Sequence, residues 1–290
     1  MSGNMRSILA MLIAVGAFSL MDAAIKTLIG HYPALQVAAL RGLAALPLVC
    51  VYVLWRREVG SLLRVRWPLH LARGVIGIVM LTLFSFALRE LGLAEAYTIF
   101  FIAPLLITML SIPVLRERVA PIHWAAIGVG MVGVLIALRP DGEAFFSWGA
   151  LAVLVAATCY AVSAIMGRVL SRTDASVSLV FWTTVSFSLG AGALALPGWV
   201  PILRDHAWVL VALAVTGFVG QLAITEAFRH GQASVIAPFE YTALAWAIAL
   251  DWTFWRITPD SYTLVGGTII IASGLYLLRK EKIRTVTVPP

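Results

Sequence analysis

Charged residues are scarce in this chain, and their scarcity excludes most classes of soluble protein. Only 12% of the 290 residues are Asp, Glu, Lys or Arg, whereas 61% are hydrophobic. The mean hydropathy is +0.95. A soluble single domain of this size could not bury so large an apolar surface. The composition therefore predicts an integral membrane protein that lies in a lipid bilayer.

Lysine, histidine and cysteine are also sparse. The lysines are Lys26, Lys280 and Lys282, and no Gly-x-x-x-x-Gly-Lys-Ser/Thr loop occurs, which argues against ATP hydrolysis by this chain. The histidines are scattered near the ends of apolar runs, without the spacing of a metal site. Cys50 and Cys159 lie within apolar runs, where thiols are more often packing residues than a disulfide or metal pair. We therefore expect no metal and no cofactor.

Long hydrophobic runs, in contrast, are abundant. A helix that spans a bilayer needs about 20 mainly apolar residues. The runs are continuously apolar and do not alternate with polar residues, which favours helices over a barrel. Ten runs meet the requirement: 7–29, 34–55, 70–88, 94–115, 121–139, 147–170, 175–197, 207–228, 233–255 and 261–279. The sequence thus predicts an all-α integral membrane protein with ten transmembrane helices and short connections.

An internal repeat divides these runs into two sets of five. The tripeptide Gly-Leu-Ala at 92–94 recurs as Gly-Gln-Ala at 231–233, and each copy precedes an apolar run that contains proline. An odd number of spans separates the copies, so the second copy must be inserted upside down relative to the first. We predict two inverted five-helix repeats, residues 1–140 and 141–290. Many transporters are built this way and bind their substrates between the repeats.

Basic residues are distributed unevenly over the predicted loops. With the N-terminus in the cytoplasm, most of them fall on the cytoplasmic side, as the positive-inside rule requires. They include Arg56, Arg57, Arg64, Arg66, Arg116, Arg118, Arg168, Arg172, Arg279, Lys280, Lys282 and Arg284. We therefore expect a multi-pass protein of the inner (plasma) membrane with both termini in the cytoplasm. The net charge of +7 is then a topology signal, and we expect no nucleic-acid partner.

Several passages resemble those of the drug/metabolite transporter superfamily. They are Ala-Leu-Arg at 87–89, Gly-Leu-Ala-Glu-Ala at 92–96, Pro104, and Leu-Arg-Glu-Arg at 115–118 followed by Trp124, Gly128 and Gly133. The passage 233–241 is similar to the metabolite-exporter branch, whose members carry two EamA-type domains. The resemblance implies a basket-like bundle around a central cavity, with the fifth and tenth spans set aside, in a monomer or homodimer. Members of the branch export amino acids or carry riboflavin, S-adenosylmethionine or sugars.

Three ionisable residues lie at membrane depth in the first two spans. Asp22 and Lys26 are four residues apart, which places them on one face of a helix, and Arg41 comes to a similar depth in the second span. Each such group costs about 2.5–3.5 kcal/mol in a bilayer, so these groups usually face a cavity or one another. We expect a mixed-charge cluster on the extracytoplasmic side. It could be a structural pair, or it could hold a substrate carboxylate and take a coupling proton on Asp22.

Glu240 is an ionisable residue at membrane depth in the second repeat, inside the ninth span and shortly after Pro238. A buried carboxylate needs a cation or several hydrogen-bond donors to compensate for its lost hydration. Arg73 in the third span and Arg229 before the ninth are the candidate partners. A structural ion pair and a role as proton carrier both remain open.

Aromatic residues within the spans are candidates for the walls of a cavity. Rings there could stack on a flat ligand or on its ammonium group. Phe18 and Tyr160 occupy matching positions in the two repeats, and we expect Trp182 to face the centre of the bundle. The full set is Phe18, Phe84, Phe101, Tyr160, Trp182, Tyr241 and Trp246. Packing or lipid contact is the alternative for each ring.

Together these observations predict a secondary transporter that moves a small organic metabolite by alternating access, driven by a gradient of substrate or of protons. The expected activity is export of amino acids, aromatic or other large apolar ones. The alternative within the same family is an importer or exchanger of a vitamin or cofactor such as riboflavin or S-adenosylmethionine. The alternative from another class is a polytopic membrane enzyme that uses Glu226 or His230 as acid or base.

Overall fold

The computed structural model describes residues 3–87, 90–91, 93–139, 147–256, 258 and 260–287, which are mainly helical. The α-helices are α1 (Gly3–Ile29), α2 (Ala34–Trp55), α3 (Trp67–Ala87), α4 (Leu93–Phe100), α5 (Ala103–Leu115), α6 (Pro121–Leu138), α7 (Trp148–Leu170), α8 (Ser176–Ala195), α9 (Ala207–His230), α10 (Ala233–Ile236), α11 (Thr242–Trp255) and α12 (Ser261–Thr287). The described residues contain ten stretches long and apolar enough to cross a membrane, and their limits lie within a few residues of the predicted runs. The prediction of an all-α protein with ten spans is confirmed.

Two spans are interrupted at proline residues. The fourth span consists of α4 and α5, and Pro104 stands in the first turn of α5. The ninth span consists of α10, the 3-10 helix η5 (Ala237–Tyr241) and α11, and Pro238 stands in the first turn of η5. Proline has no N–H group and its ring clashes with the preceding turn, so it is tolerated where a helix starts but disrupts a helix interior. The fourth span of each repeat is therefore a broken helix.

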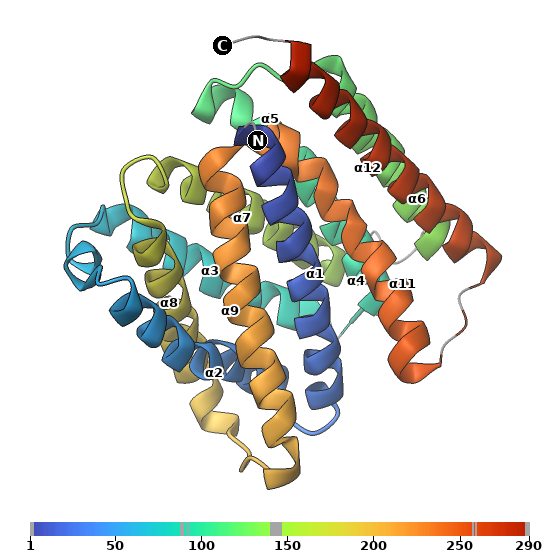
Figure 1. The fold of residues 1–290 in the computed structure, drawn as a ribbon. Helices are drawn as coiled ribbons and strands as arrows, with labels where there is room; N and C mark the ends of the chain where they lie inside the picture. Colours follow the sequence, from blue (N-terminus) through green and yellow to red (C-terminus); the bar gives the residue numbers. More distant parts are fainter. Residues whose placement is uncertain are drawn as a thin grey trace.

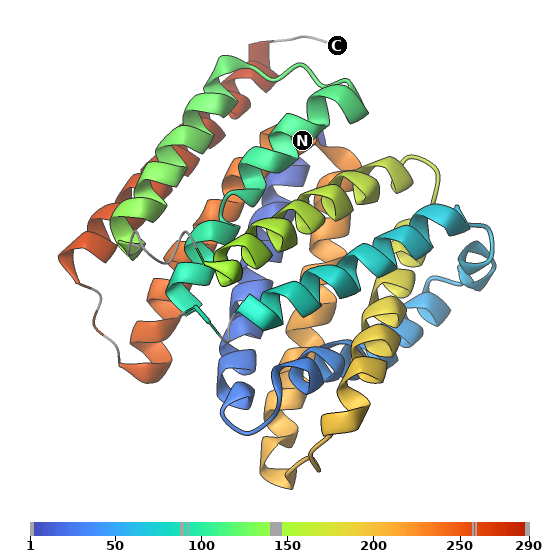
Figure 2. The same cartoon turned by 180° about the vertical axis from the view of Figure 1, so that it is seen from behind.

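The helices pack in pairs that reflect the repeat: each pair either has an equivalent pair when the repeats are exchanged or joins two equivalent helices. α1 packs along α9, and its counterpart α7 packs along α3. α2 packs against its own counterpart α8, and α6 packs against α12. Figures 1 and 2 show this arrangement from opposite sides. It is the pairing that a two-fold relation between two five-helix repeats requires.

α6 and α12 lie side by side at one edge of the bundle (Figures 1 and 2). Their close approach depends on glycine: a Cβ atom on Gly266 would lie 2.4 Å from the backbone oxygen of Gly133 and 2.6 Å from the Cβ of Ala137. Small residues of this kind let helix backbones meet in a membrane, where the hydrophobic effect does not drive association. Gly133 and Gly266 thus pack the fifth and tenth spans together.

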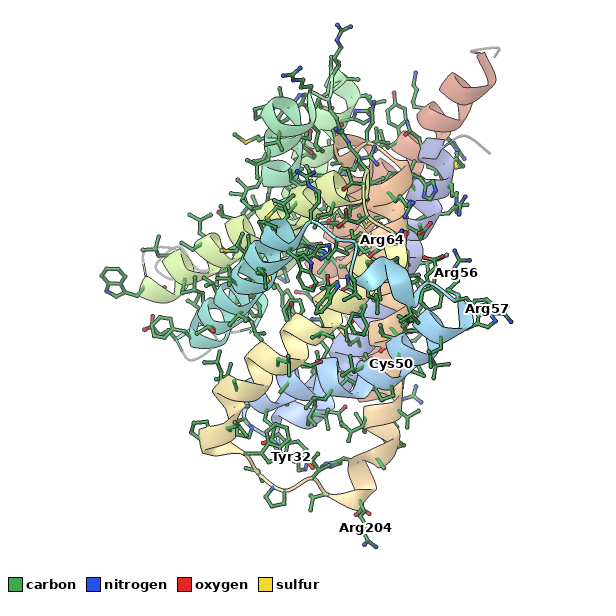
Figure 3. The ribbon with its side chains drawn as sticks, turned by 90° about the vertical axis from the view of Figure 1, so that its left-hand side faces the viewer. Tyr32, Cys50, Arg56, Arg57, Arg64 and Arg204 are labelled. Carbon is green, nitrogen blue, oxygen red and sulfur yellow. The ribbon has the colours of Figure 1, made fainter. Side chains whose placement is uncertain are left out.

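The first turn of α1 and the last turns of α12 lie at the same end of the bundle (Figure 1). Figure 3 shows Arg56, Arg57 and Arg64 around the connection between α2 and α3, away from Tyr32 and Arg204 at the opposite end. Assignment of the end that carries both termini to the cytoplasm stays a prediction. The repeat boundary at 140/141 also stays a prediction, because residues 140–146 lie outside the described part of the chain.

Candidate functional site

Polar side chains from both repeats meet between the helices, and we call this group the central polar cluster. Each member interacts electrostatically or through a hydrogen bond with at least one other member. The members are Asp22 of α1, Arg41 of α2, Arg73 of α3, Tyr97 of α4, Tyr160 of α7 and Glu240 of η5. Because the first four belong to one repeat and the last two to the other, the cluster lies at the interface between the repeats.

Asp22 and Arg41 contribute opposite charges that attract each other, and Tyr97 lies within electrostatic reach of both. Asp22 keeps exposed surface although the bundle encloses it. Lys26, the third residue of the predicted charge cluster, is exposed one turn further along α1. The structure thus brings Asp22 and Arg41 together, and their role in binding stays a prediction.

Two phenylalanine rings flank the guanidinium of Arg41. The Cζ atom of Arg41 lies 5.5 Å from the centroid of the Phe18 ring and 5.7 Å from the centroid of the Phe187 ring. Phe18 comes from α1 and Phe187 from α8, so each repeat supplies one ring. Cation–π contacts of this kind contribute about 0.5–2 kcal/mol. Sequence reasoning missed Phe187, because a phenylalanine within an apolar span carries no signal of its own.

Glu240 has a different partner from those predicted. The hydroxyl of Tyr160 donates a hydrogen bond of 3.2 Å to Oε1 of Glu240. Arg229 stands in the last turn of α9, where it donates a 2.7 Å hydrogen bond to Oγ of Ser176. Within the described part of the chain Glu240 forms no ion pair with Arg73 or Arg229, so the structure does not support the ion-pair alternative, and the role of Glu240 as a proton carrier stays a prediction.

Arg73 reaches from α3 to two helices of the other repeat. Its Nε donates to the carbonyl oxygen and to Oγ of Ser163 on α7, both at 3.2 Å, and its Nη1 donates to Oγ1 of Thr183 on α8 at 2.8 Å. All three acceptors are neutral. Sequence reasoning considered Arg73 only as a partner for Glu240, although an arginine inside a predicted span is itself a pointer to function.

A row of aromatic rings extends from the cluster. The ring of Phe100 lies 5.5 Å from that of Tyr160, Phe84 lies 5.5 Å from Phe100, and Tyr97 lies 5.9 Å from Phe84, measured between centroids. Such spacings are typical of attractive aromatic pairs. Phe84 and Tyr160, which the sequence singles out, thus belong to one aromatic wall that Tyr97 and Phe100 complete.

Other predicted rings lie away from this wall. Phe101 pairs with Tyr241 at 5.9 Å between centroids, and the buried Tyr241 packs on Gly130 of α6. Trp246 is 41% exposed and rests against Gly16 of α1. These contacts join the connection between α4 and α5, η5 and α11 to the neighbouring helices. For Phe101 and Trp246 these are packing contacts, whereas Tyr241 also interacts electrostatically with Glu240 of the central polar cluster.

Trp182 also lies elsewhere. Its indole N–H donates a 3.0 Å hydrogen bond to the carbonyl oxygen of Leu62, and its ring lies 4.7 Å from that of Trp67. Both partners belong to the connection between α2 and α3 and to the start of α3. The expectation that Trp182 faces the centre is therefore not supported, because its N–H group finds its partner at the end of the bundle.

Polar contacts join the repeats at the end of the bundle that carries the termini. The carboxylate of Glu117, after α5, accepts hydrogen bonds from the backbone N–H groups of Ala233 and Ser234 at 2.9 and 3.0 Å and from Oγ of Ser234 at 2.8 Å. These bonds cap the N-terminus of α10. Within the second repeat, Arg168 of α7 donates a 2.7 Å hydrogen bond to the carbonyl oxygen of Phe228 at the end of α9. The hydrogen bonds of Glu117 thus join the two repeats at this end of the bundle.

Asp174, in the turn between α7 and α8, ties that turn to α3. Its carboxylate is hydrogen-bonded to Nε2 of His70 at 2.9 Å, to Oγ1 of Thr173 at 2.7 Å and to the backbone N–H of Arg66 at 3.2 Å. Burial alone would raise the pKa of this carboxyl, but the hydrogen bonds outweigh burial and hold the pKa of Asp174 below its usual range. The ionised carboxylate is therefore the form that anchors this turn.

An apolar groove of about 510 Å³ lies apart from the cluster, on the outer side of α4, α6 and α7. Its lining residues include Ile99, Met131, Leu135 and Leu154, and none of them is charged. Trp148 at its rim is 76% exposed. Lipid chains would fill such a surface in a bilayer, so we place the functional site at the central polar cluster and not in this groove.

Comparison with known proteins agrees with the fold and with the repeat. The model of the EamA-like transporter family matches residues 5–139 and again residues 147–279. A solved crystal structure superposes with a TM-score of 0.82 at 19% sequence identity, and the match covers 97% of this chain and 99% of the other. At this identity the likeness shows the fold alone.

Curated relatives are described as transporters of different compounds. The chain is 27% identical over 277 residues to the pseudopaline exporter CntI of Pseudomonas aeruginosa, a match that covers 95% of this chain and 96% of the relative. It is 26% identical over 214 residues to a riboflavin transporter of Rhizobium johnstonii, covering 73% and 70% of the two chains. It is 25% identical over 216 residues to an S-adenosylmethionine uptake transporter of Rickettsia conorii, covering 73% and 72%. The chain belongs to the EamA-like transporter family, as a ten-span membrane transporter of small metabolites and not an enzyme.

Proposed function

We propose that this chain exports amino acids, aromatic or other large apolar ones, and that the central polar cluster binds them. The observation that carries this proposal is the opposite-charge pair of Asp22 and Arg41 at the interface between the repeats. An amino acid has one ammonium and one carboxylate group, and the pair offers a partner of opposite sign to each. The rings of Phe18, Phe187 and Phe84 would surround its apolar side chain.

Glu240 is our candidate for coupling transport to a proton gradient. Its partner within the described residues is the neutral hydroxyl of Tyr160. A carboxylate so enclosed is costly in its charged form unless a cation compensates it, so its protonation depends on which side of the membrane it faces. Tyr160 also interacts electrostatically with Arg41. A substrate bound at Arg41 would therefore change the electrostatic environment of Glu240 through the side chain of Tyr160.

Alternating access would proceed by movement of the two repeats around the cluster. The contacts of Glu117 with Ala233 and Ser234 join the repeats at the end that carries the termini. In our proposal that end faces the cytoplasm, and these hydrogen bonds open when the substrate enters. The broken fourth and ninth spans, at Pro104 and Pro238, are the places where backbone rotation would cost least.

Uptake into proteoliposomes that contain the purified chain tests this proposal. Radiolabelled phenylalanine, tryptophan, leucine and threonine would be offered with and without an imposed proton gradient. We expect saturable uptake of the aromatic and large apolar amino acids, and loss of this uptake in the Arg41→Gln variant. Folded protein that transports none of them, but transports riboflavin or S-adenosylmethionine, would replace the amino-acid proposal with the vitamin or cofactor alternative.

A further inference from the structure

The two arginines of the central polar cluster are not equally compensated. Arg41 faces the carboxylate of Asp22. Arg73 makes its hydrogen bonds to Ser163 and Thr183, whose oxygens carry no charge. Among the described residues no carboxylate lies within ion-pair distance of Arg73, although the bundle encloses its guanidinium. An enclosed cation without an anion is costly, so this position favours an anionic ligand.

The geometry leaves one edge of the Arg73 guanidinium available. Ser163 and Thr183 engage Nε and Nη1 and fix the plane of the group. Nη2 faces Gly167 of α7, where an added Cβ would lie 3.4 Å from it. Among the described residues Nη2 makes no hydrogen bond, so it retains its N–H donors for another acceptor. A guanidinium held in one orientation is well suited to bind a carboxylate.

Arg41 and Arg73 share an electrostatic partner. Tyr160 interacts electrostatically with Arg41 and with Arg73. Asp22 offers a carboxylate beside Arg41. One anionic group, one ammonium group and a second anionic group would therefore match Arg41, Asp22 and Arg73 in turn. An amino acid with a single carboxylate leaves Arg73 unmatched.

We propose that Arg73 is a second anion-binding position, and that the preferred substrates are amino acids whose side chain carries a further carboxylate beyond an apolar or aromatic body. This inference rests on the proposed amino-acid export and narrows its substrate class. The second carboxylate replaces the missing counterion of Arg73. The aromatic wall of Phe84 and Phe100 lies beside Tyr160 and would contact the body of the ligand.

Three matched probes test the inference: phenylalanine, 4-carboxyphenylalanine and 4-carbamoylphenylalanine. The last two differ by a carboxylate against an amide of nearly equal size. We expect wild-type proteoliposomes to prefer the acid over the amide by about tenfold or more in kcat/KM, because hydrogen bonds to charged groups are the stronger ones. The Arg73→Gln variant should lose this preference, so that its kcat/KM for the acid falls by about tenfold relative to its kcat/KM for the amide. The Arg73→Lys variant keeps the charge and should retain part of the preference, which shows that the fold survives substitution there.

The control is Arg139→Gln, which removes a cation at the end of α6 that pairs with Asp260. It should leave the ratio of acid to amide unchanged. Transport of phenylalanine by the wild type without a preference for the acid would overturn the inference and leave the amino-acid proposal standing. A preference that persists in Arg73→Gln would overturn it as well. Failure of all three probes with folded wild-type protein would overturn both proposals.

Discussion

The two repeats provide the same scaffold but different chemistry. α1 packs along α9 as α7 packs along α3, and the fourth span of each repeat is broken. With the offset that matches Phe18 to Tyr160, however, Asp22 corresponds to Ala164 and Arg41 corresponds to Thr183. The first repeat supplies the Asp22–Arg41 pair, whereas the second supplies neutral side chains at those positions. Duplication thus fixes where the helices lie, and divergence between the copies creates the site.

The difference has a physical reason. Enclosed charges are costly, and a second copy of each would add like charges close to the two-fold axis. Thr183, the counterpart of Arg41, accepts a hydrogen bond from Arg73 of the first repeat. A position that holds a cation in one copy therefore supports a cation in the other. Substitutions in each repeat can therefore measure how much that repeat contributes to transport and stability, and their expected effects differ in size.

Substitution of Arg41 should have the largest effect. Arg41→Gln leaves Asp22 without its cation and removes the predicted partner of the substrate carboxylate. We expect transport to fall by at least about 100-fold, because breaking an enclosed charge pair costs about 3–5 kcal/mol. Initial uptake rates in proteoliposomes measure this, with Arg139→Gln as the control outside the site. A variant that folds and transports at the wild-type rate would remove Arg41 from the site.

Glu240 tests what the second repeat contributes. Glu240→Gln keeps the size of the side chain and its ability to accept a hydrogen bond from Tyr160, but it cannot release a proton. We expect uptake driven by a proton gradient to fall by about tenfold, in line with the loss of a positioned proton carrier, whereas exchange of labelled for unlabelled substrate continues. An unchanged response to the gradient would exclude Glu240 from the proton pathway.

Asp174 tests stability away from the site. Because the pKa of Asp174 is lowered in the folded protein, its stabilising contribution is present above the unfolded pKa, near 4, and is lost as pH falls through the folded pKa. Asp174→Asn should lower the free energy of unfolding by about 1–3 kcal/mol at neutral pH by leaving donors unsatisfied. Thermal unfolding in detergent, measured between pH 3 and pH 7, compares the variant with wild type. Equal stability of the two proteins at pH 7 would contradict this.

The rings on either side of Arg41 should have the smallest effects. Phe18→Leu and Phe187→Leu each remove one cation–π contact, one from each repeat. We expect each to weaken substrate affinity by a few-fold, because such contacts contribute about 0.5–2 kcal/mol. Competition assays with unlabelled phenylalanine measure both. If Phe18→Leu has a large effect and Phe187→Leu has none, the second repeat contributes packing and not binding.

The ten spans could be predicted from the sequence because a helix in lipid must be long and continuously apolar, and this requirement leaves a local signature. The proximity of Asp22 and Arg41 could also be predicted, since charged side chains at membrane depth usually face a cavity or one another. The partner of Glu240 could not be predicted, because it depends on which helices meet. Tyr160 comes from α7, whereas Arg229 lies in the last turn of α9 and binds Ser176. Trp182 looked central by repeat symmetry, but its N–H group required the acceptor that Leu62 provides.

The most direct test of the account compares phenylalanine with phenylalaninamide and phenethylamine in proteoliposomes. The amide has a neutral carboxamide in place of the carboxylate, and the amine has no group at that position. We predict saturable transport of phenylalanine alone, and loss of this transport in Arg41→Gln. Equal transport of all three compounds by the wild type would contradict the claim that the Asp22–Arg41 pair at the interface of the repeats recognises an amino acid.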